Sequence, residues 1–156
     1  MRVGTGWDLH QLAPGRRLIL GGVVIEADKG CVGHSDGDAL FHAVIDALLG
    51  ASGLEDIGTL FPDTDPTYKD ADSAKLLEKV VAKVKSLGFS ISNVDTTVIL
   101  QSPKLGPYKK QIKQSLAGLL GVEETAVGVK AKTAEGILGE LGKGEAVIAQ
   151  AVVLLQ

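Results

Sequence analysis

The segment from Ala146 to Leu155 constrains the fold most, because every residue in it except Gln150 is apolar. A short, nearly continuous apolar run is typical of a strand buried at the centre of a sheet. Arg2–His10, Val94–Gln101 and Val127–Thr133 are the other segments that read as strands of this sheet. With 20 glycines and few aromatic residues, the core must be built from aliphatic side chains, which suits strands packed on helices.

Three helical segments alternate with these strands. Ser35 is expected to cap a helix that ends near Gly50, and Asp72 or Ser73 to cap a second helix that closes at Gly88. A third helix begins at Pro107. The remaining features are a short hairpin with its turn at Gly21-Gly22, a loop at 30–35 and a long irregular stretch at 53–66.

This order predicts an α/β (α+β-like) fold in a single domain over residues 1–156. We expect a mixed four-stranded sheet plus a small hairpin, with the helices packed on one face of the sheet. The formal net charge of −3 gives no reason to expect nucleic-acid or membrane binding. The start of the chain lacks the apolar core of a signal peptide, and Cys31 is the single cysteine, so we expect a cytoplasmic protein.

The three histidines all fall within the first 42 residues, and two of them pair with nearby carboxylates. Asp8 and His10 are two apart on a strand, and Asp38 and His42 are four apart on a helix, so each pair shares a face. Two imidazoles and one carboxylate suit zinc and leave a fourth position open for substrate. Spacing alone leaves Asp38 as plausible a ligand as Asp8. The alternative is that Asp38 only caps the helix and the histidines are partly buried.

Two further groups of residues suggest ligand binding: a set of acidic residues on loops and the start of the first helix. Asp56, Asp63 and Asp65 lie in the irregular stretch and Glu135 lies on a later loop, where carboxylates commonly bind cations or substrate hydroxyls. They read equally well as solvated turn residues. Gly33-His34-Ser35 precedes a helix, and free N–H groups at a helix start favour a phosphate, although a plain cap is the alternative.

Several blocks of the sequence match a known family in order along nearly the whole chain. They include Gly6-Trp7-Asp8-Leu9-His10, His34-Ser35-Asp36-Gly37-Asp38 and Phe61-Pro62-Asp63-Thr64-Asp65-Pro66. On these blocks the chain resembles the 2-C-methyl-D-erythritol 2,4-cyclodiphosphate synthases of the non-mevalonate isoprenoid pathway. The resemblance implies a homotrimer with active sites between subunits.

The resemblance also implies a reaction. The 2-phosphate of 4-diphosphocytidyl-2-C-methyl-D-erythritol 2-phosphate attacks the β-phosphorus of the same molecule, which closes a cyclic diphosphate and releases CMP. Asp8, His10 and His42 are implied to bind zinc, and Glu135 to bind Mg²⁺ or Mn²⁺. His34 and Thr133 are implied to stabilise the transition state as catalytic residues.

The substrate-binding residues implied by the resemblance fall into two sets. Those around the methylerythritol and its phosphates are Asp8, His10, His34, Ser35, Asp56, Ile57, Gly58, Phe61, Asp63, Asp65 and Glu135. Those around the cytidine are Leu100, Pro103, Lys104, Leu105, Gly106, Ala131, Lys132 and Thr133.

The chain departs from the family pattern near its end. Lys132 stands where the family has a threonine, which adds positive charge near the phosphates or points away from them. The segment 137–145 is one residue longer, lacks a phenylalanine and carries Lys143 in place of an arginine. Two other functions are kept as alternatives: a zinc-dependent phosphohydrolase acting on a nucleotide-linked substrate, and a non-catalytic zinc-binding trimer module.

Overall fold

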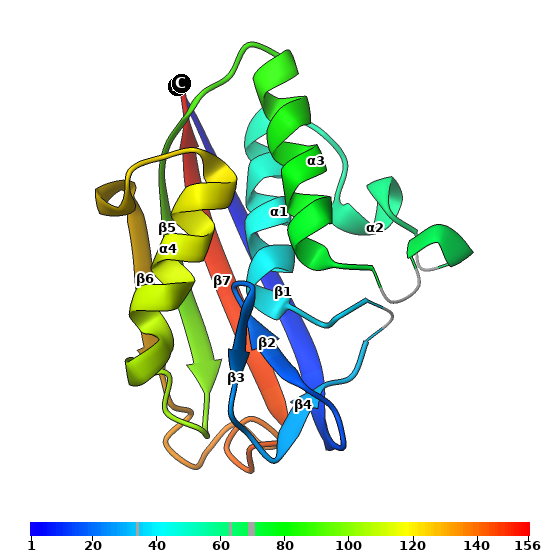
Figure 1. The fold of residues 1–156 in the computed structure, drawn as a ribbon, viewed down its shortest axis with the longest axis vertical. Coiled ribbons are helices and arrows are strands. Elements are labelled where there is room, and N and C mark those ends of the chain that lie inside the picture. Colours follow the sequence, from blue (N-terminus) through cyan, green and yellow to red (C-terminus); the bar gives the residue numbers. More distant parts are fainter. Residues whose placement is uncertain (34, 63, 69–70) are drawn as a thin grey trace.

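The computed structural model describes residues 1–33, 35–62, 64–68 and 71–156. Within these residues the chain forms a mixed five-stranded sheet with helices on one face, and a separate two-stranded hairpin (Figure 1). The strands are β1 (Arg2–Pro14), β2 (Leu18–Leu20), β3 (Val23–Ile25), β4 (Lys29–Cys31), β5 (Ile91–Leu100), β6 (Val127–Lys132) and β7 (Ala146–Leu155). The helices are α1 (Ala39–Ser52), α2 (Ile57–Leu60), α3 (Ser73–Ser86) and α4 (Lys109–Leu120), with 3₁₀ turns η1 (Pro66–Tyr68), η2 (Gly106–Tyr108) and η3 (Glu124–Ala126).

The apolar strand β7 lies at the centre of the sheet, as its composition predicts. The strand order is β4-β1-β7-β5-β6, with β5 and β6 parallel and the other pairs antiparallel. The sheet has one strand more than the four expected, because β1 continues to Pro14 and Lys29–Cys31 pairs with its end. That short strand replaces the first part of the loop expected at 30–35.

Helix α1 lies very close to β1, and two glycines make this possible. A Cβ atom at Gly4 would lie 2.0 Å from the carbonyl oxygen of Ala47, and one at Gly6 would lie 1.8 Å from that of Ala43. No side chain fits at either position, so the helix rests directly on the strand. The alternation of β1 then directs Asp8 toward the same helix face.

The first helix begins later than expected, at Ala39 instead of after Ser35. Gly37 has a positive φ of 71°, and Asp38 supplies the cap by accepting a hydrogen bond from the N–H of Phe41. The helix start expected at Ser35 is therefore wrong, whereas a phosphate contact at Ser35 stays a prediction. The second helix starts after Asp72 as predicted, with that carboxylate capping the N–H of Ala74.

No helix formed by the described residues covers the other face of the sheet (Figure 1). Large apolar side chains on it are exposed, including Val3, Trp7 and Leu9 of β1 and Val152 of β7. The exposed residues of β1 alternate along the strand with the two glycines, Asp8 and His10, so their side chains point to the opposite face of the sheet. Apolar patches of this kind on a monomer usually mark an interaction surface.

None of the helices in the described parts of the chain has the length and apolar character needed to cross a bilayer.

Candidate active site

The predicted metal ligands meet where β1 and α1 are in contact. Asp8 and His10 come from β1 and His42 from the first turn of α1, and one ligand atom from each lies within 4.8 Å of the others. Asp8 Oδ2 is 2.7 Å from His10 Nδ1 and 3.5 Å from His42 Nδ1. Among the described residues this is the one His/Cys/Asp/Glu group close enough to share an ion. The two-apart spacing on β1 and the tight packing of α1 together create it.

The triad has the properties of a cation site. Burial raises the pKa of Asp8, but the close His10 and His42 rings outweigh it and lower the pKa to about 2. Despite their proximity, Asp8 Oδ2 and His10 Nδ1 are buried without a hydrogen-bond partner of acceptable geometry among the described residues. Buried polar atoms without partners are rare, and two that converge are satisfied by a shared cation. The donor set of two nitrogens and one oxygen therefore fits zinc.

Asp38 is not part of the triad. Its spacing from His42 had left it as plausible a metal ligand as Asp8, and the structure selects Asp8. Its carboxylate accepts hydrogen bonds from the N–H groups of Gly21, Gly22 and Phe41 at 2.9, 2.7 and 3.0 Å. It thereby caps α1 and holds the turn of the β2-β3 hairpin against the helix. Complete burial raises its pKa to about 6, although the three donated hydrogen bonds oppose that shift.

A cavity of about 260 Å³ opens beside the triad. Its lining includes a set of predicted substrate residues: Asp8, His10, Ser35, Ile57, Gly58 and Phe61. His42, Gly33, Tyr68 and Leu76 complete the lining, and of these Tyr68 packs edge-on against Phe61 with ring centroids 5.3 Å apart. Four residues that the resemblance places around a methylerythritol, Ser35, Ile57, Gly58 and Phe61, therefore line one cavity with the metal ligands.

Among the described residues, Asp56 and Asp65 do not gather into a second cation site. Asp56 accepts hydrogen bonds from the N–H and hydroxyl of Thr59, and Asp65 accepts one from the N–H of Thr67. Both carboxylates act as turn and helix caps within the described residues. The predicted residues His34 and Asp63 lie outside the described residues.

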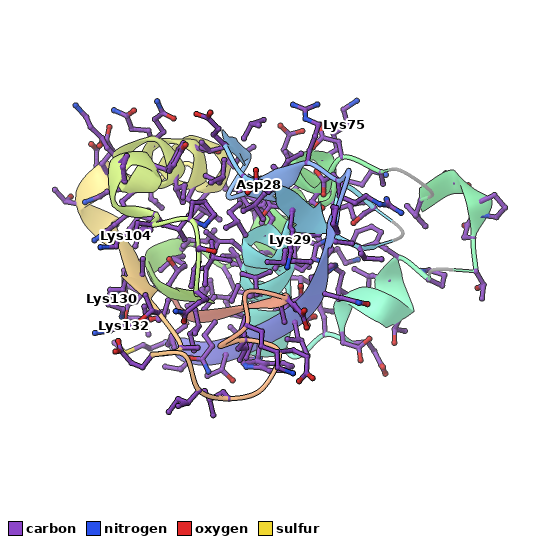
Figure 2. The ribbon with its side chains drawn as sticks, turned by 90° about the horizontal axis from the view of Figure 1, so that it is seen from below. Asp28, Lys29, Lys75, Lys104, Lys130 and Lys132 are labelled. Atoms are coloured by element: carbon purple, nitrogen blue, oxygen red, sulfur yellow. The ribbon has the colours of Figure 1, made fainter. Side chains whose placement is uncertain are left out.

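A second cavity, of about 420 Å³, lies at the β6 edge of the sheet. It is lined by Leu100, Lys104, Leu105, Gly106, Pro107, Lys109, Ala131, Lys132 and Thr133. Apart from Pro103, which lines a neighbouring cavity, this lining contains the whole set predicted around the cytidine. Figure 2 shows Lys104, Lys130 and Lys132 on the same side of the molecule, opposite the side that carries α2. Lys130 pairs with Asp95, whereas Lys132 lines the cavity and adds charge there.

Thr133 and Glu135 are held together at the end of β6. The Thr133 hydroxyl donates to Glu135 Oε1 at 2.7 Å, and Glu135 has a positive φ of 53°, which is uncommon for this residue type. Gln101 stabilises this turn by accepting hydrogen bonds from the N–H groups of Ala134 and Gly136. Both predicted side chains are exposed and available to a ligand.

The two cavities lie on opposite sides of one chain. Across the sheet, Leu9 of β1 pairs with Ile148 of β7, and Ile148 pairs with Ile99 of β5. Ile99 in turn pairs with Lys132 at the end of β6. The end of β6 is therefore at the height of the triad but three strand spacings away, about 14 Å. A single ligand that uses both cavities must bridge two copies of the chain or span this whole width.

A larger cavity, of about 790 Å³, lies between the end of β1 and the segment 138–145. It is lined mainly by apolar side chains, among them Leu9, Leu141 and Ile148. None of the described metal ligands reaches it, so its size does not make it the reaction site. It continues the uncovered apolar face of the sheet.

Four residues that support the site were missed from the sequence: Asp36, Asp46, Ser73 and Gln101. Asp46 Oδ1 accepts the N–H of Ile57 at 2.8 Å and so holds α2 beside the triad. Asp46 follows His42 by one helical turn, and this spacing was a usable signal. Ser73 lies 2.9 Å from His42 Nε2, but a contact 31 residues away in the chain leaves no local pattern.

Comparisons with known proteins agree with this geometry. A family model described as the YgbB family matches residues 1–156. The 2-C-methyl-D-erythritol 2,4-cyclodiphosphate synthase of Laribacter hongkongensis is 55% identical over 156 residues, which are 100% of this chain and 96% of that protein. A solved structure of a 2C-methyl-D-erythritol-2,4-cyclodiphosphate synthase in a CDP-bound form has a TM-score of 0.92 at 41% identity, covering 99% of this chain and 100% of the other.

A bifunctional IspDF structure from Campylobacter jejuni is similar as well, with a TM-score of 0.94 and 42% identity. The match covers 99% of this chain and 42% of that one, so this chain corresponds to part of the bifunctional protein.

Proposed function

The chain belongs to the YgbB family, and from this premise we propose that it forms 2-C-methyl-D-erythritol 2,4-cyclodiphosphate, the product for which its relatives are named. The substrate is 4-diphosphocytidyl-2-C-methyl-D-erythritol 2-phosphate. An oxygen of its 2-phosphate forms a bond to the β-phosphorus, the bond from that phosphorus to the bridging oxygen breaks, and CMP leaves with the bridging oxygen. The observation that carries the proposal is the preformed triad of Asp8, His10 and His42 in its cavity.

Zinc is the metal we propose for this triad. When bound there, it would polarise the β-phosphate oxygens as a Lewis acid. The chain's own contribution is geometric, because the ligands come from a strand and a helix in direct contact. Asp46 holds the start of α2 beside them, which positions Ile57 and Gly58 against the substrate.

We assign the nucleotide to the cavity at the β6 edge. Lys104, Lys109 and Lys132 supply positive charge for a diphosphate there, and the solved structure of a relative is a CDP-bound form. Thr133 is proposed to contact the phosphates, and Glu135 would hold Mg²⁺ or Mn²⁺, which would supply positive charge to stabilise them. Because both phosphates belong to one molecule, the site has to hold them in line for attack, and this positioning is the main rate factor in the scheme.

A homotrimer with sites between subunits is the assembly we propose. Two features support it: the metal cavity and the nucleotide cavity lie on opposite edges of the sheet, and the uncovered face exposes Val3, Trp7, Leu9 and Val152. Contact between copies would bury this face and bring one copy's triad near another's nucleotide cavity. Location in the cytoplasm stays a prediction.

Product analysis tests the function against both alternatives. The purified protein is incubated with the diphosphocytidyl substrate, Zn²⁺ and Mg²⁺, and the products are identified by ³¹P NMR. Cyclic diphosphate together with CMP is the expected result. Linear hydrolysis products would indicate the phosphohydrolase, and metal binding without turnover would indicate the non-catalytic module.

A further inference from the structure

The imidazole ring of His42 is contacted at both of its nitrogens. Nδ1 lies 3.5 Å from Asp8 Oδ2, inside the triad, and Nε2 lies 2.9 Å from the hydroxyl oxygen of Ser73. Ser73 is fully buried in the first turn of α3, so bulk water does not compete for this contact. The ring therefore connects the metal triad to a helix that contributes no ligand to the triad.

The proton of the Ser73 hydroxyl is already committed. Asp36 accepts it through Oδ1, and Asp36 Oδ2 accepts the backbone N–H of the same serine at 3.1 Å. A serine hydroxyl has one proton to donate, so toward His42 its oxygen acts as acceptor. The hydrogen in the Ser73–His42 contact must then reside on Nε2 of the ring.

This arrangement selects one form of the neutral imidazole. With hydrogen on Nε2, the lone pair is on Nδ1, which faces Asp8 and is free to bind a cation. Ser35 Oγ lies 3.2 Å from the same Nε2 and is held by the N–H of Gly37, so it offers a second oxygen on that side of the ring.

We propose that Asp36 and Ser73 are positioning residues that hold His42 as the Nε2–H tautomer and so aim Nδ1 at the metal. The inference rests on the proposed function, in which Asp8, His10 and His42 bind a divalent metal. Neither residue lines the cavity beside the triad. Partners of this kind behind a metal-bound histidine fix its tautomer and orientation, and their loss typically weakens metal binding by about 10- to 100-fold.

Zinc affinity, measured by competition with a chromogenic chelator, is the first test. Ser73→Ala should weaken zinc binding by about 10- to 100-fold, because Nε2–H loses its nearer acceptor, at 2.9 Å against 3.2 Å for Ser35 Oγ, and the ring can turn or change tautomer. Ser73→Thr keeps the hydroxyl and should restore affinity to near the wild-type value. Ser52→Ala is the matched control, since this buried serine of α1 bonds only to the carbonyl of Leu48 among its described contacts and should leave affinity unchanged.

The tautomer is read directly by ¹⁵N NMR of the metal-free protein labelled at histidine, recorded at alkaline pH so that the His42 ring is neutral, with the His42 signals assigned from His42→Ala. Wild type should show the Nε2–H form at His42, and Ser73→Ala a mixture of both forms. Asp36→Asn is a second variant, which keeps the shape but weakens the acceptor of the serine proton, and it should shift the spectrum in the same direction. A purely structural serine would change the unfolding temperature but not the tautomer.

The outcomes separate this inference from the proposed function. If wild type binds zinc tightly and Ser73→Ala binds it equally well, or keeps the Nε2–H form alone, the positioning role is overturned while the metal site stands. If wild type itself binds no zinc, the metal site is wrong and the inference is wrong with it.

Discussion

At the scale of single residues, the site depends on which atoms of Asp8, His10 and His42 are left without partners. Two of these atoms are buried and unpaired within the described part of the chain. A shared cation would satisfy both at once. The triad itself is positioned by β1 and α1, whose backbones are in direct contact.

His42→Ala and Glu135→Ala should therefore separate the two metals. His42→Ala removes a ligand from a three-residue site and should abolish zinc retention and activity. Glu135→Ala should leave zinc bound but weaken the Mg²⁺ dependence of turnover. Zinc content is measured by mass spectrometry and Mg²⁺ dependence by titrating activity. Wild-type zinc content in His42→Ala would refute the ligand assignment, and an unchanged Mg²⁺ titration in Glu135→Ala would refute its role.

The thiol of Cys31 should be unreactive toward disulfide reagents in the folded protein. Burial, followed by the negative charges of Asp38, Asp8 and Asp36, raises the pKa of this thiol to about 12. At pH 8 only about one thiol in 10⁴ is then ionised, and the thiolate is the reactive form. A disulfide reagent should label Cys31 at pH 8 only after denaturant is added. Equal labelling rates with and without denaturant would contradict the burial described for it.

Single residues also show the limit of sequence reasoning. The two-apart spacing of Asp8 and His10 was enough to pair them, because strand geometry is local. The choice between Asp8 and Asp38 was not local, since Asp38 is removed from the triad by hydrogen bonds to the distant turn at Gly21-Gly22. Ser73 was read as a possible cap, and its contact with His42 depends on how α3 packs.

At the scale of elements, the contact between β1 and α1 determines the site. The two glycines of β1 bring the helix backbone onto the strand. Asp8 and His10 follow them on the same face of β1, and His42 directly precedes Ala43 in α1. A wider separation would draw His42 away from Asp8. The precision of the metal site is therefore set by residues that take no part in the chemistry.

Gly6→Ala should damage both stability and metal binding. The new Cβ would lie 1.8 Å from the carbonyl oxygen of Ala43, and a helix backbone yields less readily than a side chain. We expect a loss of at least about 1–3 kcal/mol in the free energy of unfolding, measured with urea, together with weaker zinc binding. Gly50→Ala is the control: nothing lies near its Cβ, and it should stabilise α1 by about 0.5–1 kcal/mol. Equal stabilities for the two variants would contradict the close approach.

Most helices and strands could be predicted from hydrophobic periodicity and from helix-capping residues. The cap at Asp72 and the apolar β7 were read correctly because both signals lie within the segment itself. The start of α1 was misplaced because Ser35 is as good a cap as Asp38 in sequence, and only the left-handed Gly37 between them decides it. The extra strand β4 is three residues long and exists through pairing with β1, which no local pattern reveals.

At the scale of the whole molecule, the helix-free face of the sheet and the separation of the two cavities point to assembly. Val152 lies near the middle of β7, opposite Thr5 of β1 and Asp95 of β5, and its side chain is 46% exposed. Burial of this face between copies would remove apolar area from water and join complementary halves of the site.

Val152→Glu should dissociate the trimer, because a carboxylate would be buried without a partner. Light scattering should show a trimer for wild type and a smaller species for the variant. The variant should retain zinc, since its ligands come from one chain, but lose turnover. Val24→Glu is the matched control, an exposed valine on the hairpin strand β3 that should change neither mass nor activity. A monomeric, fully active wild type would contradict the shared site.

The central claim is that the substrate's own phosphate, not water, attacks the β-phosphorus. The reaction run in H₂¹⁸O with mass spectrometry of both products tests this most directly. Intramolecular attack predicts that neither CMP nor the cyclic diphosphate acquires ¹⁸O, because every oxygen at phosphorus comes from the substrate. One ¹⁸O atom in either initial product would show hydrolysis and contradict the account.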